Sequence, residues 1–193
     1  DYSYGDVTDF KGHAGKLAAP TKLVTDETIG KMAASFGGMN VVSYDFAPED
    51  IDDIRHAFTL ETYFKITDTE PYQQILSIKD AYVSLGVEDG VLSAFAELAG
   101  GVDSHSVCHT SIEENEWIHV IFTYDNKKAR LYVNGELTGE ERYPGGLKTD
   151  IDTSYKKITL GGYDMTSDNL AKGSMINMFS LSQGVMSAEQ AKA

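Results

Sequence analysis

A regular alternation of apolar and polar residues over 58–66 restricts the fold of this chain more than any other feature. One side of an extended segment would carry Phe58, Leu60, Phe64 and Ile66, and the other side Thr59, Glu61, Tyr63 and Lys65. Successive side chains of a β-strand point to opposite faces, so a period of two is typical of a strand with one buried face. The segment therefore predicts a half-buried strand.

Further β-like runs follow at short intervals, and turn-forming residues separate them. The runs lie at 74–79, 81–87, 91–97, 118–124, 129–133, 158–160 and 175–181. Asn134-Gly135, after the fifth of these runs, is the strongest short hairpin signal that a sequence can carry. Many short strands joined by tight turns predict an all-β fold, an antiparallel β-sandwich. Helical periodicity is limited to 25–34 and 47–54, which predict a turn or two of helix each.

The length and composition favour one domain over residues 1–193. At 193 residues and 41% hydrophobic content the chain can bury one substantial core, and no internal repeat or Pro-rich linker divides it. The first residues resemble no signal peptide, and the end of the chain reads as a Ser187-x-x-Gln190 capping box followed by helix formers. We therefore expect this domain to be a piece of a larger multidomain protein.

The charge balance excludes several classes of partner. Sixteen basic and 30 acidic side chains give a net charge of -14, which repels phosphate backbones and anionic lipid headgroups. The chain also lacks the run of roughly 18 apolar residues that a membrane span needs. We expect no nucleic acid partner and no membrane insertion. The single cysteine, Cys108, excludes an internal disulfide.

The segment 117–124 has apolar or amphipathic residues on both faces of a predicted strand. Trp117 then has two interpretations, a core or edge aromatic and a ligand platform, and the first is favoured because large rings concentrate in sandwich cores. His119 has no serine, cysteine or second histidine at a recognisable catalytic spacing. A structural histidine is therefore favoured over a general base.

The order of several motifs resembles the laminin-G-like, concanavalin A-like jelly-roll family. The matching segments are Phe58-Thr59-Leu60-Glu61, Trp117-x-His119-Val120, Leu131-Tyr132-Val133-Asn134-Gly135, Ile158-x-Leu160-Gly161-Gly162 and Gly173-Ser174-Met175-Ile176-Asn177. The resemblance implies a jelly roll of two curved antiparallel sheets with minor short helices. It also implies a non-catalytic module of a larger bacterial extracellular or cell-surface protein. Its partners would be a glycan or neighbouring domains of the parent protein.

Catalysis is the next possibility, since glucan hydrolases share this fold. Such enzymes place two carboxylates about 5 to 10 Å apart and typically carry a Glu-x-Asp-x-Glu strand, which this sequence lacks. We therefore expect no enzymatic activity. Two alternatives stay open: a purely structural spacer attached to a catalytic domain such as a hydrolase or phosphoesterase, and an unusual hydrolase.

The resemblance also implies one structural calcium ion that ties the first loop to the last strand. The matching positions are Asp9 and Asn177, and many relatives carry aspartate at the second position. The amide in place of a carboxylate weakens the case, because calcium favours charged oxygen ligands. Ordinary turn acids would give the same pattern.

Sugar binding requires aromatic rings exposed on a surface. Tyr63, Tyr82 and Tyr132 fall on the polar sides of their predicted strands and are our candidates for carbohydrate contacts. The alternative is that tyrosines favour strands and half-buried edges in any case.

Overall fold

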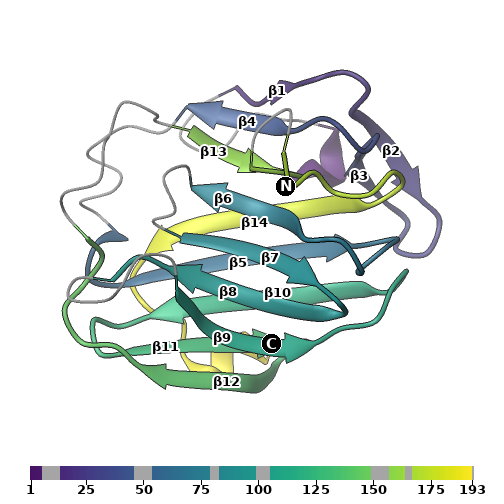
Figure 1. Ribbon diagram of the computed structural model, residues 1–193. Coiled ribbons are helices and arrows are strands. Elements are labelled where there is room, and N and C mark those ends of the chain that lie inside the picture. Colours follow the sequence, from purple (N-terminus) through teal and green to yellow (C-terminus); the bar gives the residue numbers. More distant parts are fainter. Residues whose placement is uncertain are drawn as a thin grey trace.

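The computed structural model describes residues 1–5, 14–45, 54–78, 83–98, 105–148, 157–163 and 167–192. These residues form two antiparallel sheets of seven strands each, packed face to face (Figure 1). The predicted all-β sandwich of the jelly-roll type is therefore confirmed.

The two sheets are named here from the view of Figure 1. The front sheet has the order β1 (Lys16–Leu17), β4 (Val42–Asp45), β13 (Lys157–Leu160), β6 (Gln73–Ile78), β7 (Val83–Glu88), β8 (Val91–Ala96) and β9 (His105–Ser111). The back sheet has the order β12 (Glu136–Arg142), β11 (Lys128–Val133), β10 (Trp117–Tyr124), β5 (Phe58–Lys65), β14 (Met175–Gln183), β3 (Lys31–Ser35) and β2 (Lys22–Asp26). Two short helices, η1 (Tyr2–Tyr4) and α2 (Ala188–Ala191), lie near the ends of the chain.

The core lies between the sheets and is built from the apolar side of each alternating strand. Phe58, Leu60 and Phe64 of β5 are fully buried, as the alternation predicts. Leu60 pairs with Phe122 of β10, and the rings of Phe58 and Phe122 meet edge to face at 5.4 Å. Burying a side chain of this size contributes about 1.5–3 kcal/mol. The outward residues of the same strands are thereby fixed on the opposite face.

The helix predicted for 25–34 is wrong, because these residues form the β2–β3 hairpin. Asp26 pairs with Lys31, and the Asp26 side chain accepts a 2.9 Å hydrogen bond from the backbone of Thr28. Gly30 adopts a left-handed φ of 64°, which closes the turn. The apolar residues that imitate a helical period lie instead in the turn, at Ile29, and along β3, where Ala33 and Ala34 are both buried. The other predicted helix, 47–54, lies outside the described residues apart from Ile54.

The hairpin between β11 and β12 forms one edge of the back sheet. Asn134 and Gly135 have φ angles of 49° and 81°, so the predicted hairpin turn is confirmed. The strand that follows, β12, is an edge strand with mostly exposed side chains. Its Glu140 pairs with Lys128 and Arg130 of β11.

The C-terminal segment folds back over the outer face of the back sheet. Ser187 and Gln190 form the predicted capping box at the start of α2. Ala191 of this helix packs on Ile121 and Tyr132. Within the described residues no helix has the length and apolar character that crossing a membrane requires.

Candidate functional site

A shallow depression of about 480 Å³ lies on the outer face of the back sheet. It is lined by Asp1, Lys31, Tyr63, Trp117, His119, Asn134, Asn177 and Met178. Two of the residues predicted from the sequence, Tyr63 and Asn177, therefore come together here. We refer to this site as the back-sheet depression.

The register of β5 and β10 places the three rings of the depression side by side. Tyr63 pairs with His119, and Lys65 pairs with Trp117. The neighbours Phe64 and Ile118 point into the core, so the residues on either side of them must point outward. The same alternation that builds the core thus presents the aromatic residues on the outside.

The aromatic rings form a continuous row across the two strands. The ring centroids of Tyr63 and Trp117 are 4.9 Å apart and the planes are tilted by 38°. His119 meets Tyr63 edge-on at 6.3 Å. Trp117 is half-buried on the outer face, so it is an edge aromatic that also borders the depression.

A buried carboxylate fixes the indole of Trp117. Asp26 is 6% exposed, and its Oδ1 accepts a 3.1 Å hydrogen bond from Trp117 Nε1. Its Oδ2 lies 2.5 Å from Lys65 Nζ, and this ammonium stands 5.3 Å from the centre of the Trp117 ring. The hydrogen bond to Asp26 thus fixes the edge of the indole, and the ammonium group of Lys65 lies over its face.

The strand pairing explains how Asp26 reaches Trp117. β3 pairs with β14 at only two positions, through Ala34 and Ser35. The rest of the β2–β3 hairpin extends beyond this contact and carries Asp26 to Lys65 and Trp117. Lys31, the pairing partner of Asp26, also borders the depression.

The electrostatic state of the site follows from these contacts. Burial raises the pKa of Asp26, but hydrogen bonds from Lys65 and Trp117 outweigh this and lower the pKa from 3.8 to about 2. Asp26 is therefore ionised at neutral pH. Burial, followed by the charge of Asp26, raises the pKa of Tyr63, so its hydroxyl stays protonated and can donate.

His119 and Asn134 form the polar wall of the depression. His119 Nε2 lies 2.7 Å from Glu61 Oε1, which supplies the side-chain partner expected of a structural histidine. The His119 backbone N–H donates to Asn134 Oδ1 at 3.0 Å, and the Asn134 N–H donates to the His119 carbonyl at 2.8 Å. These two hydrogen bonds hold Asn134, which also forms the hairpin turn, beside His119 in the depression.

Tyr132 does not take the position that we expected for a sugar-binding residue. It points to the outer face as predicted, but it is only 4% exposed because Met186 and Ala191 of the C-terminal segment cover it. Its ring offers no free face for stacking in this arrangement. Tyr82 lies outside the described residues.

Of the two predicted calcium ligands, only Asn177 can be placed. It is 3% exposed, and its Nδ2 donates to the Met32 carbonyl at 2.7 Å and to Ser3 Oγ at 3.2 Å. These bonds leave its amide oxygen as the atom that could bind a cation. Asp9 lies outside the described residues, and within those described no group of three or more His, Cys, Asp or Glu side chains is arranged to hold a metal.

The family of the chain follows from its sequence. The profile of the concanavalin A-like lectin/glucanases superfamily matches residues 40–192. The chain therefore belongs to this superfamily, as its motifs predicted. A comparison with curated proteins finds no match.

Two kinds of protein are among the solved structures that share this fold. Domain 4 of AbnA, a GH43 extracellular arabinanase from Geobacillus stearothermophilus, solved in complex with arabinotriose, is 15% identical with a TM-score of 0.73. The alignment covers 99% of this chain and 93% of that one. The botulinum neurotoxin serotype D binding domain is 16% identical with a TM-score of 0.69 over 94% of this chain. The binding domain of botulinum neurotoxin DC in complex with SialylT is 14% identical with a TM-score of 0.72 over 94% of this chain.

The extent of these matches differs. The present chain spans less than half of the neurotoxin chains, 46% and 45% of their lengths, whereas it matches almost the whole arabinanase domain. At these identities the likeness shows a common fold.

Proposed function

We propose that this domain is a non-catalytic carbohydrate-binding module of a larger extracellular protein, and that the back-sheet depression is its binding site. The observation that carries the proposal is the pair of adjacent rings, Tyr63 and Trp117, on the outer face of a sheet. Both rings border a hollow that also contains polar side chains. The extracellular location is part of the proposal and follows from the family resemblance.

The chemistry of the depression suits a saccharide. Sugars present apolar C–H faces that pack on aromatic rings, and hydroxyls that exchange hydrogen bonds with amide, imidazole and ammonium groups. Tyr63 and Trp117 supply the rings, while Lys31, His119 and Asn134 supply polar groups around them. Because Asp26 already holds the Trp117 indole, little side-chain freedom would be lost on binding.

Two of the structural relatives support this proposal by what they bind. The arabinanase domain was solved with arabinotriose and the neurotoxin DC binding domain with SialylT. Both ligands contain sugars, and both proteins share the sandwich described here.

The absence of catalysis is proposed on two grounds. The sequence contains no Glu-x-Asp-x-Glu strand. Two carboxylates that could serve are already engaged: Glu114 Oε1 accepts hydrogen bonds from the backbone and side chain of Thr69, and Glu61 contacts His119. These contacts favour structural roles for both acids.

A glycan array with the purified domain tests the function. We expect selective binding that Trp117→Ala or Tyr63→Ala weakens at least tenfold, equivalent to about 1.4 kcal/mol. Leu137→Ala, which removes a side chain 52% exposed on β12, is the matched control and is expected to bind normally. Unchanged binding by folded Trp117→Ala and Tyr63→Ala would move the site elsewhere, and a blank array would favour the spacer.

The structural calcium remains a separate proposal. The described residues fit it only in part, since Asn177 offers one amide oxygen and the acidic partner Asp9 lies outside the described residues. Thermal unfolding with calcium and with a chelator would test it. A higher melting temperature in calcium that Asn177→Ala abolishes is the expected result, and identical transitions would dismiss the ion.

A further inference from the structure

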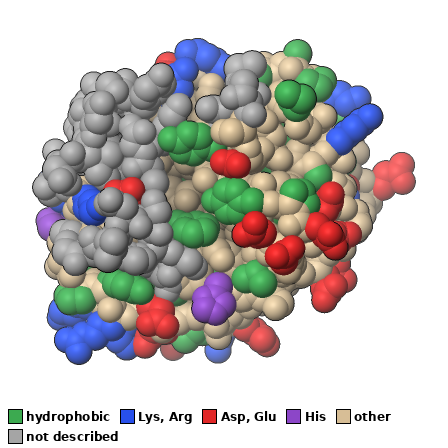
Figure 2. Space-filling model, viewed as in Figure 1, with side chains coloured by type: hydrophobic (Ala, Val, Ile, Leu, Met, Phe, Trp, Pro, Cys, Tyr) green, Lys and Arg blue, Asp and Glu red, His purple; other side chains and the backbone are tan. Residues whose placement is uncertain are grey.

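A second hollow, of about 270 Å³, lies on the outer face of the front sheet. It is lined by Tyr72, Gly86, Val87, Glu88, Asp89, Val91, Ser93 and Phe95. Figure 2, which views this face, shows hydrophobic side chains near its middle and acidic side chains toward its right-hand rim. We refer to this site as the front-sheet hollow.

The floor of the hollow is made of unusually small residues. Gly86 of β7 and Ser93 of β8 are paired across the sheet and both line the hollow. A Cβ atom on Gly86 would lie 3.2 Å from one ring carbon of Tyr72 and 3.2 Å from its hydroxyl oxygen. The glycine therefore lets the side chain of Tyr72 pack closely against the backbone of β7.

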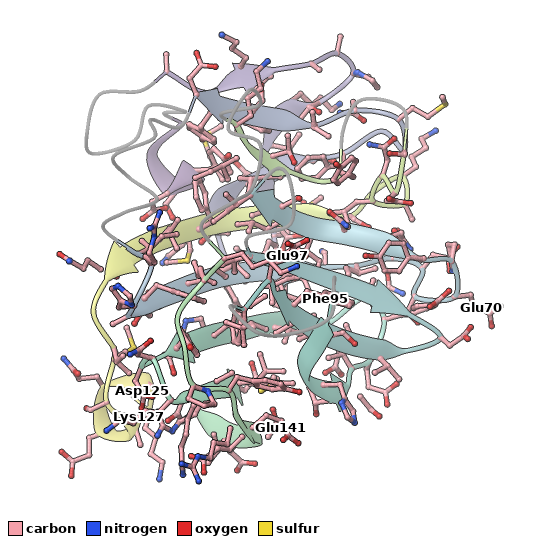
Figure 3. All side chains as sticks on the ribbon, turned by 60° about the vertical axis from the view of Figure 1, so that its left-hand side comes forward. Glu70, Phe95, Glu97, Asp125, Lys127 and Glu141 are labelled. Atoms are coloured by element: carbon pink, nitrogen blue, oxygen red, sulfur yellow. The ribbon has the colours of Figure 1, made fainter. Side chains whose placement is uncertain are left out.

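Two aromatic rings border this floor. Tyr72 is half-buried, and its hydroxyl accepts a 3.1 Å hydrogen bond from Gln74 Nε2, which fixes its position. Phe95 is half-buried on the outward side of β8, two residues from Ser93 (Figure 3). Phe95 does not belong to the core, because its neighbours Ala94 and Ala96 occupy the side of β8 that faces the core.

The charge around the hollow is negative. Glu88 and Asp89 line it and are exposed, and the Asp89 backbone N–H donates to the Glu70 carbonyl in the adjacent loop. Among the described residues that line the hollow none is basic. Such a rim repels carboxylates and sulfates and accepts hydrogen bonds from hydroxyl and ammonium groups.

We infer that the front-sheet hollow is a second saccharide site, selective for sugars without negative charge. The inference depends on the proposed function only in taking the ligand to be a saccharide. Tyr72 and Phe95 provide the stacking surfaces, and Glu88 and Asp89 accept hydrogen bonds from hydroxyl or amino groups.

The two sites lie on opposite faces of the sandwich. The front-sheet hollow opens on the outer side of β7 and β8, and the back-sheet depression on the outer side of β5 and β10. Packed sheets are about 10 Å apart, so one domain can hold two separate glycan chains at once. Because the two sites face in opposite directions, they would cross-link two separate glycan chains, and a single flat surface could engage only one of them at a time.

The single tryptophan separates the two sites experimentally. Trp117 is the only tryptophan of the chain and borders the back-sheet depression, so its fluorescence reports that site alone. The Trp117→Ala protein leaves the front-sheet hollow intact. Calorimetric titration of this variant therefore measures the second site even if the first site binds nothing.

The test titrates the Trp117→Ala protein with three trisaccharides: neutral N-acetylglucosamine, cationic glucosamine and anionic galacturonate. We expect binding of the neutral or cationic trimer and none of the anionic one. Adding Phe95→Ala or Tyr72→Ala should weaken this binding at least tenfold, with thermal unfolding confirming that each variant is folded. Adding Leu137→Ala, on the exposed edge strand, should leave it unchanged.

A charge reversal tests selectivity without removing a ring. Adding Glu88→Lys to the Trp117→Ala protein should weaken binding of the glucosamine trimer and admit the galacturonate trimer. The inference is overturned if the Trp117→Ala protein binds none of the trimers, if it binds only the anionic one, or if folded Phe95→Ala and Tyr72→Ala variants bind as before. None of these outcomes bears on the fluorescence response of Trp117, which tests the back-sheet depression.

Discussion

Trp117 Nε1 donates a 3.1 Å hydrogen bond to Asp26 Oδ1 across a separation of 91 residues in the chain. This contact joins the first hairpin of the back sheet to a strand near its centre. A buried ion pair with Lys65 completes the arrangement. The orientation of the proposed sugar platform thus depends on an acid that is not among the residues lining the depression.

The first prediction concerns this acid. Asp26→Asn removes the charge opposite Lys65, which is itself largely buried, and we expect the free energy of unfolding to fall by about 3 kcal/mol. The matched control is Asp45→Asn, which breaks the exposed pair with Lys16 and should cost at most about 1 kcal/mol. Urea unfolding at neutral pH measures both, and equal small losses would show that the buried pair adds nothing.

The pH dependence of stability provides a second prediction. The pKa of Asp26 is lowered from 3.8 to about 2 in the folded protein. A folded pKa below the unfolded value means that the contribution is complete above 3.8 and disappears as the pH falls through about 2. The difference corresponds to about 2 kcal/mol. The stability gap between wild type and Asp26→Asn should therefore narrow over this acid range, and a constant gap would contradict the prediction.

Gly161 provides a third prediction. A Cβ atom at this position would lie 2.1 Å from the Phe36 ring, and the glycine also has a left-handed φ of 86°. We expect Gly161→Ala to lower the free energy of unfolding by about 3 kcal/mol or more. Gly30→Ala isolates the backbone contribution, because Gly30 has a φ of 64° and an added Cβ atom would have no neighbour within 4 Å. We expect this variant to lose about 1 kcal/mol of stability. Similar losses for the two variants would argue against a clash at Phe36.

Cys108 allows a fourth prediction. Burial, followed by the negative charge of Glu141, raises the pKa of this thiol to about 12. Because the thiolate is the reactive form, a disulfide reagent at mildly alkaline pH should modify the native protein only as fast as it unfolds. Denaturant should make the reaction rapid. Rapid labelling of the folded protein would show that the space between β9 and β12 opens readily.

The fifth prediction concerns Tyr63 and Tyr132, which the sequence pattern places in the same way, on outward strand positions. Tyr132→Ala should destabilise the domain by about 3 kcal/mol, because it empties the space beneath α2, and should leave sugar binding intact. Tyr63→Ala removes a half-exposed ring and should weaken binding with a smaller loss of stability. Thermal unfolding and calorimetric titration of both variants would reveal the reverse pattern if our assignment were wrong.

The sequence predicted those strands that alternate strongly and lie inside a sheet. β5, β10 and β11 are found within one residue of their expected bounds, because each has one face in the core. β12 was missed because nearly all of its residues are exposed, so it has no apolar period. The β2–β3 hairpin was mistaken for a helix because Ile29, Met32 and Ala33 follow a helical spacing of three and four residues, and β3 itself carries consecutive apolar residues without a strand alternation.

The candidate site was predicted only in part, for a related reason. Alternation places Tyr63 and Tyr132 on outward faces, but it does not reveal that α2 covers one of them. The contact between Asp26 and Trp117 depends on how far the first hairpin departs from the sheet, and this distant pairing has no local signal. Residues brought together by strand register therefore need the three-dimensional structure.

The exposed border formed by β12 has a consequence for how this protein behaves in crowded solution. The outer edge of a border strand offers backbone hydrogen bonds to any other copy that approaches it. Glu136, Glu140, Glu141 and Arg142 crowd this border with charges, most of them of one sign. Pairing with a second copy would take these charged side chains out of water, so edge-to-edge association is disfavoured at β12.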